Sequence, residues 1–205
     1  MPKETFINLK PDKKQKIIDA TIKELSIHPY EHINLANIIR DAQIPRGSFY
    51  QYFENKDDLY LFFTSYISEK KAEMFKDVFD MTTEMTFIMR FKKIFLRGFE
   101  FAHAYPKLVQ AGYYMTQSPL FRESKLYQAS YEAGIKFFEQ MIKRDQDKGI
   151  IRDEVDARML ASAILEYMNK LNLDFYMNPS ESLDTIEAKA DFVFDILEKG
   201  IIKHV

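Results

Sequence analysis

Residues 34–56 read Asn-Leu-Ala-Asn-Ile-Ile-Arg-Asp-Ala-Gln-Ile-Pro-Arg-Gly-Ser-Phe-Tyr-Gln-Tyr-Phe-Glu-Asn-Lys, and this stretch decides how the first part of the chain folds. Asn34 is a good helix N-cap, and the apolar residues that follow it recur at helical spacing up to Ala42. Pro45 suits the first position of a second helix and prevents the first helix from continuing. The stretch therefore predicts two short helices separated by a tight turn, which is a helix-turn-helix.

The second of these helices has one apolar face and several polar positions. Phe49 and Phe53 lie four residues apart and share a face, so we expect them to anchor the helix. Gly47, in the first turn, costs about 1 kcal/mol of helix stability relative to Ala. We therefore expect another surface to approach closely at Gly47. Taken alone, the polar residues on the other sides would be ordinary solvated positions; they are Arg46, Ser48, Tyr50 and Tyr52.

These residues carry a specific resemblance. The segment 42–50, Ala-Gln-Ile-Pro-Arg-Gly-Ser-Phe-Tyr, followed by Tyr52-Phe53, Lys56 and Leu59, resembles the signature of the TetR family of bacterial transcription regulators. The similarity extends back through residues 6–9 and 17–20, and so covers roughly the first third of the chain. The resemblance implies that the second helix enters the major groove of DNA. The expected DNA-binding residues are Asn34, Arg46, Gly47, Ser48, Tyr50, Tyr52 and Lys56.

Two positions in this region leave open questions. Gln43 stands where the family usually has Gly, and a left-handed turn residue is easiest for Gly, so we expect some strain at the turn. Lys56 begins the next helix, where it could sit on a DNA phosphate, as the matching Lys of the family does. The alternative is a surface lysine paired with Asp57 or Glu54.

The composition favours an all-α protein. The chain has 205 residues, 46% of them hydrophobic, so it can bury a sizeable core. It contains only six Gly and seven Pro, and no linker rich in Gly, Ser or Pro divides it. We expect about nine helices: a three-helix DNA-binding head in residues 1–56, joined to a helical ligand-binding and dimerisation bundle in residues 57–205.

Charge and residue types exclude several kinds of site. The net charge is −2, so the chain does not coat nucleic acid by bulk attraction, and any DNA contact must be a local patch. There is no Cys, which excludes disulfides, thiolate metal sites and a Cys nucleophile. The N-terminus lacks the apolar segment of a signal peptide, and no apolar run reaches the roughly 18 residues of a membrane span. We expect a cytoplasmic protein.

One short motif supports an enzymatic alternative. His28-Pro29-Tyr30-Glu31-His32 has the spelling of an inverted zinc-protease motif, which requires both His on one face of a continuous helix. Pro29 breaks that helix, so a loop with solvent-facing imidazoles is expected instead. We predict no catalytic residue, no metal and no cofactor.

Beyond about Met81 only helical periodicity remains. It predicts helices from Phe87 to Tyr105, from Pro106, from Pro119 to Lys148, and two final helices separated by a break at Asn178-Pro179-Ser180. Gly98 and Gly134 lie on apolar stripes, where either the helices touch closely or a hollow remains.

The family resemblance implies a ligand cavity among the middle helices and a dimer formed by the last two. An aromatic stripe can equally be core, and the last two helices can pack inside the monomer. The candidate ligand-binding residues are Phe95, Phe99, His103, Tyr113, Tyr114, Tyr131, Phe138 and Tyr167. The candidate dimer-interface residues, on helices 156–175 and 184–202, are Ala163, Tyr167, Ala190, Phe194 and Leu197.

The sequence thus predicts a homodimeric transcription regulator. We expect a repressor that is released from a palindromic double-stranded DNA operator by a small, largely apolar or aromatic effector. The alternatives are an all-α adaptor without DNA binding, and a metal-dependent hydrolase that uses His28, Glu31 and His32. Neither the effector, the operator nor the regulated genes follow from the sequence.

Overall fold

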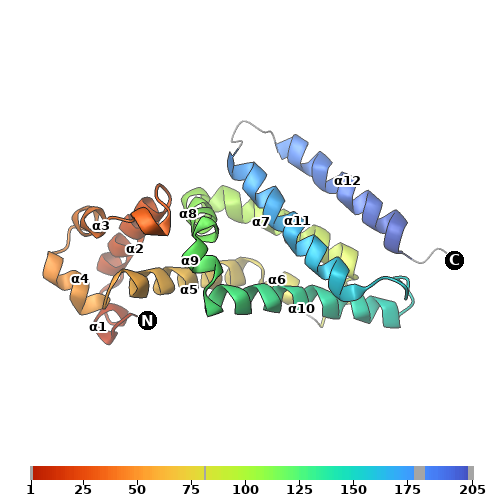
Figure 1. The fold of residues 1–205 in the computed structure, drawn as a ribbon, viewed down its shortest axis with the longest axis horizontal. Helices are drawn as coiled ribbons and strands as arrows, with labels where there is room; N and C mark the ends of the chain where they lie inside the picture. Colours follow the sequence, from red (N-terminus) through yellow and green to blue (C-terminus); the bar gives the residue numbers. More distant parts are fainter. Residues whose placement is uncertain (1, 81, 178–182, 203–205) are drawn as a thin grey trace. The chain divides into compact units, whose positions relative to one another are not determined.

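The computed structural model describes residues 2–80, 82–177 and 183–202 of the chain (Figure 1). Within these ranges the regular elements are twelve α-helices and one 3₁₀ turn, and Ile151 and Ile202 form an isolated β-bridge. Three of the helices have four residues each, which leaves nine longer ones in the described part of the chain. The prediction of an all-α fold with about nine helices is confirmed.

The order of the elements along the chain is as follows. In chain order they are α1 (Glu4–Ile7), α2 (Pro11–Leu25), η1 (Tyr30–His32), α3 (Leu35–Asp41), α4 (Arg46–Tyr52), α5 (Lys56–Met74), α6 (Lys76–Phe79), α7 (Phe87–Ala104), α8 (Pro106–Gln117), α9 (Pro119–Arg122), α10 (Lys125–Asp147), α11 (Ala157–Met177) and α12 (Leu183–Ile201).

The chain divides into two compact units, and each is described by itself. Unit 1 comprises Met1–Lys76 and Glu100–Arg122, and unit 2 comprises Asp77–Phe99 and Glu123–Val205. Helix α7 contributes to both units, because the division falls within it. The functional boundary between residues 56 and 57 is a separate matter and stays a prediction.

The core of unit 1 joins α1 to the helices of the helix-turn-helix. Phe6 is fully buried, and its ring centroid lies 4.7 Å from that of Phe53. Glu24 of α2 is also buried, and its carboxylate accepts a hydrogen bond from the backbone N–H of Asn34 at 2.8 Å. The remaining buried members of this core are Ile17, Ile18, Ala20, Ile38, Ala42, Ile44, Phe49, Tyr52 and Leu59.

The core of unit 2 is built from aromatic rings on three helices. Phe91 of α7 lies 6.1 Å from Phe138 of α10 and 5.1 Å from Phe194 of α12, measured between ring centroids, and both pairs are close to perpendicular. Such edge-to-face pairs are favourable beyond the area that they bury. Helices α10 and α11 touch closely at Gly134, where a Cβ atom would lie 3.3 Å from a methyl carbon of Leu165.

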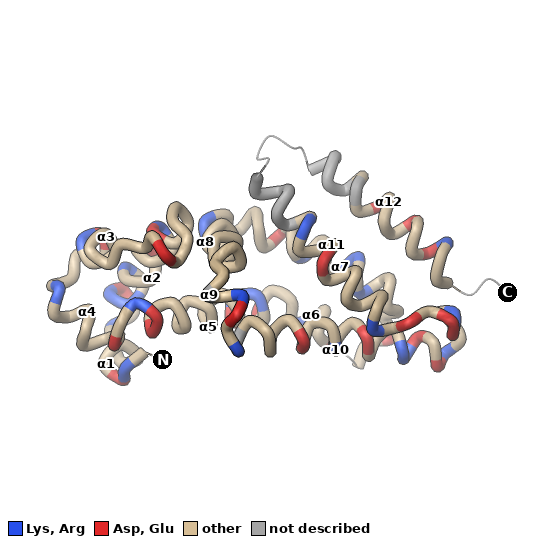
Figure 2. Tube along the Cα trace, viewed as in Figure 1, with Lys and Arg blue, Asp and Glu red and all other residues tan. Residues whose placement is uncertain are grey.

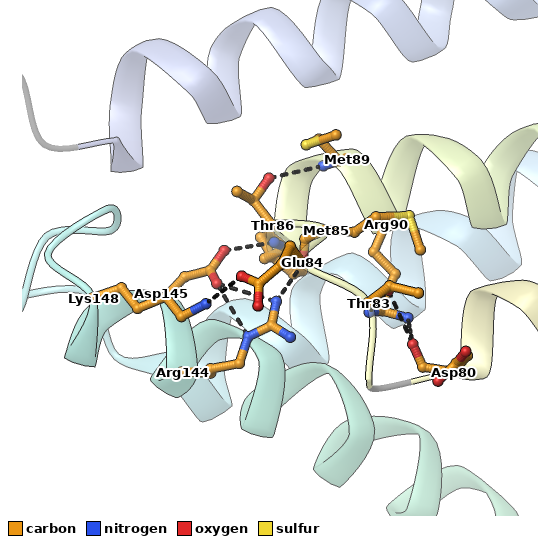
Figure 3. A network of polar contacts seen from close by, with 11 residues as sticks. Asp80, Thr83, Glu84, Met85, Thr86, Met89, Arg90, Arg144, Asp145 and Lys148 are labelled. Atoms are coloured by element: carbon orange, nitrogen blue, oxygen red, sulfur yellow. Dashed lines mark hydrogen bonds and ion pairs between the residues drawn. The ribbon is translucent and has the colours of Figure 1, made fainter.

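A buried arginine organises the connection between α6 and α7 (Figure 3). Arg90 is fully buried, and its guanidinium donates hydrogen bonds to the carbonyls of Val78 and Asp80 and to the hydroxyl of Thr83. Val78 is buried, and the Asp80 carbonyl also accepts a hydrogen bond from the hydroxyl of Thr83 at 3.1 Å. Hydrogen bonds to a charged group are worth about 1.5–3 kcal/mol each. Arg90 therefore holds the connection in one conformation.

A charged pair, Arg144 and Asp145, fixes the start of α7 in the same network (Figure 3). The carboxylate of Asp145 on α10 accepts a hydrogen bond from the N–H of Phe87 at 2.6 Å, and it is almost completely buried. Arg144 donates to the carbonyl of Met85 and lies 3.3 Å from Asp145. An anion at a helix N-terminus is favourable, so Asp145 acts as a cap supplied from another helix.

Most predicted helix bounds agree with the structure, but two helices expected to be continuous are divided. The helix that begins at Lys56 was expected to run to about Phe79, whereas α5 ends at Met74 and α6 is separate. The single helix expected from Pro119 to Lys148 is two helices, α9 and α10. Ser124 separates them, because its hydroxyl accepts a hydrogen bond from the N–H of Tyr127 and caps α10. The expected break at residues 178–180 lies outside the described residues.

Candidate functional site

The turn between α3 and α4 has the backbone form that usually requires glycine. Gln43 has a φ angle of 55°, and it is the one non-glycine residue with positive φ in the described part of the chain. The N–H of Gln43 donates to the carbonyl of Arg40 at 3.0 Å, and that of Ile44 to Ile39 at 3.2 Å. These bonds satisfy the last carbonyls of α3 across the turn. Gln43 therefore adopts the left-handed backbone conformation at which strain was expected.

Helix α4 is held by its two phenylalanines. Phe49 and Phe53 are fully buried, and their ring centroids lie 5.6 Å apart. The opposite side of the helix is exposed at Arg46, Gly47 and Tyr50. The anchoring predicted from the four-residue spacing is confirmed, and α4 presents a polar face to solvent.

Gly47 has no role in the internal packing of unit 1. A Cβ atom placed on it would meet no other atom within 4 Å. The cost of a glycine in the first turn is thus not offset by contacts within the chain. This agrees with the expectation that the requirement for glycine comes from an external surface.

Two residues near the N-terminus bond the carbonyls that end α4. The backbone N–H of Lys3 donates to the carbonyl of Tyr52 at 2.9 Å, and its ammonium donates to that of Tyr50 at 2.9 Å. The hydroxyl of Thr5 donates to the carbonyl of Gln51. The last carbonyls of a helix have no partner within it, and a cation there is favourable. The N-terminal arm, residues 3–6, therefore caps α4 from outside.

Two of the predicted DNA-binding residues have structural roles. Tyr52 is 5% exposed and lies against the ring of Phe6, so its ring is part of the core rather than of the exposed face. Asn34 is exposed, and its side chain accepts a hydrogen bond from the N–H of Ala36 at 2.9 Å, which confirms it as the N-cap of α3. Ser48 is half-buried on α4.

Lys56 contacts a residue of the chain that the sequence did not indicate, and its contact with a DNA phosphate stays a prediction. Its ammonium donates to the carbonyl of Tyr30 at 3.0 Å and lies 4.3 Å from the centroid of the Tyr30 ring. A cation over an aromatic face is attracted by the ring. Lys56 therefore connects the first residue of α5 to the η1 turn.

Acidic residues partly balance the basic residues of the helix-turn-helix. Along the trace of unit 1, Lys and Arg are interspersed with Asp and Glu (Figure 2). Lys23 lies 2.6 Å and Arg40 3.0 Å from the carboxylate of Asp41. Hydrogen bonds from Lys23 and Arg40 hold the pKa of Asp41 below its usual range. The basic patch is modest, as the composition indicates.

The candidate ligand-binding residues are divided between the two units. His103, Tyr113 and Tyr114 belong to unit 1, and the other five belong to unit 2. Tyr131 donates a hydrogen bond to the carboxylate of Glu166, which raises the pKa of the tyrosine. The other residues of the set in unit 2 are Phe95, Phe99, Phe138 and Tyr167, of which Phe95 and Phe138 are buried. A pocket common to this set stays a prediction.

The candidate dimer residues include both exposed and buried positions. Ala163 of α11 is exposed, whereas Ala190 and Phe194 of α12 are 3% and 5% exposed. Phe194 faces α7, where it contacts Phe91 and Phe95. The face of α12 that carries Ala190 and Phe194 therefore packs inside the monomer, which was the alternative left open. Tyr167 and Leu197 are half-buried.

The residues of the zinc-protease spelling do not lie on a continuous helix. Helix α2 ends at Leu25, and Tyr30–His32 is a separate 3₁₀ turn. Glu31 accepts a hydrogen bond from the hydroxyl of Ser118. Among the described residues no three His, Asp or Glu side chains are grouped so as to hold a metal ion. None of the described helices is long and apolar enough to cross a membrane.

Sequence reasoning missed the residues of unit 1 whose hydrogen-bond partners are distant in the sequence. No role was predicted for Lys3, Thr5 or Ser118. Their partners are 46 to 87 residues away in the chain. A local sequence pattern does not predict which distant carbonyl or carboxylate a hydroxyl or an amine will bond.

Part of the sequence matches the model of a known protein family. Residues 17–61 match the family model of the bacterial regulatory proteins, tetR family. No curated protein sequence matches the chain significantly. The matched segment includes α3, the turn and α4.

Solved structures resemble the chain over nearly its whole length. A TetR family transcriptional regulator from Chloroflexus aurantiacus J-10-FL has 24% sequence identity and a TM-score of 0.78, with 100% of both chains covered. FadR from Bacillus subtilis, solved in complex with stearoyl-CoA, has 19% identity and a TM-score of 0.73, with 91% of this chain and 98% of FadR covered. A gamma-butyrolactone receptor (ArpA-like protein) has 14% identity and a TM-score of 0.63, with 92% and 96% covered. At these identities the likeness shows the fold.

Proposed function

We propose that this chain, which resembles TetR-family regulators both in the sequence of residues 17–61 and in its fold, is a ligand-responsive repressor that binds a palindromic operator as a homodimer. In this proposal α4 enters the major groove, and residues 57–205 bind the effector and the second copy. An effector acts by favouring the conformation that binds DNA less well, and a coupling of about 1–3 kcal/mol is typical of such proteins.

One observation carries the DNA-binding part of the proposal. Helix α4 is anchored by two fully buried phenylalanines, and it exposes Arg46 and Tyr50, which are four residues apart. It also exposes Gly47, whose lack of a side chain is not required by any contact within 4 Å. An arginine that reaches base edges can bind guanine through two hydrogen bonds, and the other side chains fix the helix in the groove. This is the arrangement that a recognition helix needs.

The test begins with selection of duplex DNA from a random pool by the wild-type protein. Arg46→Ala should then weaken binding to the selected sequence by about tenfold or more, because a base contact is worth about 1–3 kcal/mol. Circular dichroism should remain that of the wild type, since Arg46 is exposed. Lys107→Ala, an exposed cation on α8, serves as the matched control and should bind normally. A protein that enriches no sequence would contradict the proposed function.

The dimer part rests on apolar side chains that unit 2 leaves exposed. Met159 of α11 is 72% exposed, and Phe192 and Ile196 of α12 are 66% and 51% exposed. Phe192 and Ile196 are four residues apart and share a face of α12, while the buried Phe194 lies on another. Exposed apolar faces of this kind are typical of interfaces between subunits.

Light scattering tests the dimer and the position of its interface. The Phe192→Asp variant should be a monomer that remains folded, because its charge is introduced at an exposed position. Phe194→Asp should instead lose its folded structure, because it places a charge among buried rings. A wild-type monomer at micromolar concentration that binds DNA tightly would argue against the dimer.

The effector part is supported by aromatic residues with polar tips and by the similar structures. Tyr113 and Tyr114 on α8 are half-buried with ring centroids 5.4 Å apart, and His103 on α7 is exposed. FadR, which has this fold, was solved with stearoyl-CoA. We therefore choose stearoyl-CoA as the first probe. It should weaken binding to the selected DNA, and free coenzyme A is the control. Equal affinity with and without it would exclude this long-chain thioester as the effector.

A further inference from the structure

A hydrogen bond joins two distant parts of unit 1. Ser118 is 1% exposed and is the C-cap of α8, and its hydroxyl donates to the carboxylate of Glu31 at 2.5 Å. This bond keeps the pKa of Glu31 below its usual range. The end of α8 is thereby fastened to the η1 turn, which precedes the helix-turn-helix in the sequence.

The η1 turn also contacts an aromatic ring of α5. Tyr30 is 7% exposed, and its ring centroid lies 4.5 Å from that of Tyr60 on α5. Tyr60 in turn contacts the ring of Phe121 on α9 at 5.7 Å. The hydroxyl of Tyr60 is buried and has no hydrogen-bond partner among the described residues, so these rings are held mainly by packing. A displacement of the turn therefore changes the contact between the Tyr30 and Tyr60 rings.

Lys56 is attached to the other side of the same turn. Its ammonium is bonded to the carbonyl of Tyr30 and lies over the Tyr30 ring. Lys56 is the first residue of α5, and Asn55 before it caps this helix by accepting a hydrogen bond from the N–H of Asp58. Only Phe53 to Asn55 separate Lys56 from the end of α4. The position of Tyr30 therefore bears on the segment that follows α4.

We infer that the η1 turn transmits the position of the α8 C-terminus to Lys56, and through Lys56 to α4, with Ser118 and Lys56 acting as positioning residues. This inference rests on the proposed function, because it names the contacts by which a change on α8, the helix of Tyr113 and Tyr114, reaches the DNA-binding face. In it Lys56 acts first on Tyr30, and its charge toward DNA is a separate contribution.

The variant Ser118→Ala tests the first contact. It removes the hydrogen bond to Glu31, and with it the weaker one that Ser118 accepts from the N–H of Phe121 at 3.4 Å, without changing any charge. The side chain that remains is still small enough for the buried site. Thr116→Ala is the matched control, because the hydroxyl of Thr116 bonds only to the carbonyl of Tyr113 within α8. Both variants should retain the circular dichroism of the wild type.

The first measurement needs no DNA. In protein labelled with ¹³C-lysine, the ε-methylene signal of Lys56 should be shifted by the ring current of Tyr30, and it is assigned by its loss in Lys56→Met. In Ser118→Ala this signal should move toward the position of an exposed lysine, whereas Thr116→Ala should leave it in place. An identical signal in Ser118→Ala and wild type would overturn the inference, whether or not the protein binds DNA.

The second measurement uses the duplex selected by the wild type. Ser118→Ala should bind it about 5-fold more weakly, which is within the usual range for a residue that modulates coupling. The slope of log affinity against log salt should stay unchanged, because no phosphate contact is lost. Lys56→Met should weaken binding as well. The double variant Ser118→Ala/Lys56→Met should have the same affinity for the duplex as whichever single variant binds it more weakly. Independent, multiplicative effects would overturn the inference, while failure of the wild type to select DNA would contradict the proposed function alone.

Discussion

Two connections between helices, one in each unit, are fixed by opposite means. The α3–α4 turn in unit 1 is closed by backbone hydrogen bonds, and it holds Gln43 in the left-handed region. The α6–α7 connection in unit 2 is held by the buried side chain of Arg90, which bonds three groups of the connection. The local turn depends on a residue that tolerates its backbone angles. The longer connection depends on hydrogen bonds from a buried side chain of the helix that follows it. The two should therefore respond differently to substitution.

The largest effect is expected at Arg90. Arg90→Leu removes the donors to Val78, Asp80 and Thr83, and leaves a buried residue, Val78, without this donor to its carbonyl. We expect the free energy of unfolding of unit 2 to fall by about 3–5 kcal/mol, because three hydrogen bonds to a charged group are lost at once. Denaturant unfolding monitored by hydrogen exchange measures it. Lys136→Met, on the exposed side of α10, is the control and should change stability little. A loss below about 1 kcal/mol would show that water replaces the guanidinium.

The next effect concerns two glycines that sequence periodicity treats alike. Gly134→Ala places a methyl group 3.3 Å from Leu165, so Leu165 must shift, and overpacking of this kind costs about 1–3 kcal/mol. Gly98→Ala meets no atom within 4 Å, and it should stabilise α7 by up to about 1 kcal/mol. Thermal unfolding of the two variants should therefore shift in opposite directions. Equal shifts would mean that α10 and α11 approach less closely than the structure has them.

A smaller gain is expected from Gln43→Gly. Glycine adopts a positive φ without steric cost, and the left-handed conformation costs other residues about 1–2 kcal/mol. Part of this gain is lost to the larger entropy of glycine in the unfolded chain, so a net stabilisation of about 1 kcal/mol is expected. Urea unfolding measures it. Gln51→Gly, within α4, is the control and should destabilise by about 1 kcal/mol. A destabilised Gln43→Gly protein would contradict the strain at this turn.

The smallest effect on stability is expected from Gly47→Ala. This variant should affect DNA binding more than stability. A methyl group at this position meets nothing within 4 Å, so the fold should be unchanged or stabilised by less than about 1 kcal/mol. Binding to the selected DNA should nevertheless weaken, because the methyl group stands between α4 and the surface that approaches it. Fluorescence anisotropy against the same duplex measures this. Unchanged affinity would mean that glycine is not required for DNA binding at position 47.

The difference between the two connections also explains what the sequence could predict. The cap at Asn34, the start of α5 at Lys56, the end of α10 near Lys148 and the anchors on α4 depend on residues a few positions apart, and they were predicted. The direction in which Phe194 faces, by contrast, depends on which helix of the fold lies opposite, and one apolar stripe does not contain that information.

The same limit applies to the candidate site. The exposed face of α4 followed from the spacing of Phe49 and Phe53, whereas Tyr52 was assigned to that face and lies in the core. Phe6 covers Tyr52, and nothing near Tyr52 in the sequence reveals this. The partners of Lys56 were likewise sought among its neighbours, while Tyr30 lies 26 positions away.

The N-terminal arm makes α4 a poor candidate for study in isolation. A synthetic peptide of residues 34–56 would contain the whole signature, yet the last three carbonyls of α4 would lose the partners that Lys3 and Thr5 supply. A seven-residue helix is too short to be stable in water by itself. An affinity tag fused directly before Lys3 carries a related risk, because it adds chain beside the three hydrogen bonds that cap α4. Tags are therefore better placed where no part of the arm is disturbed.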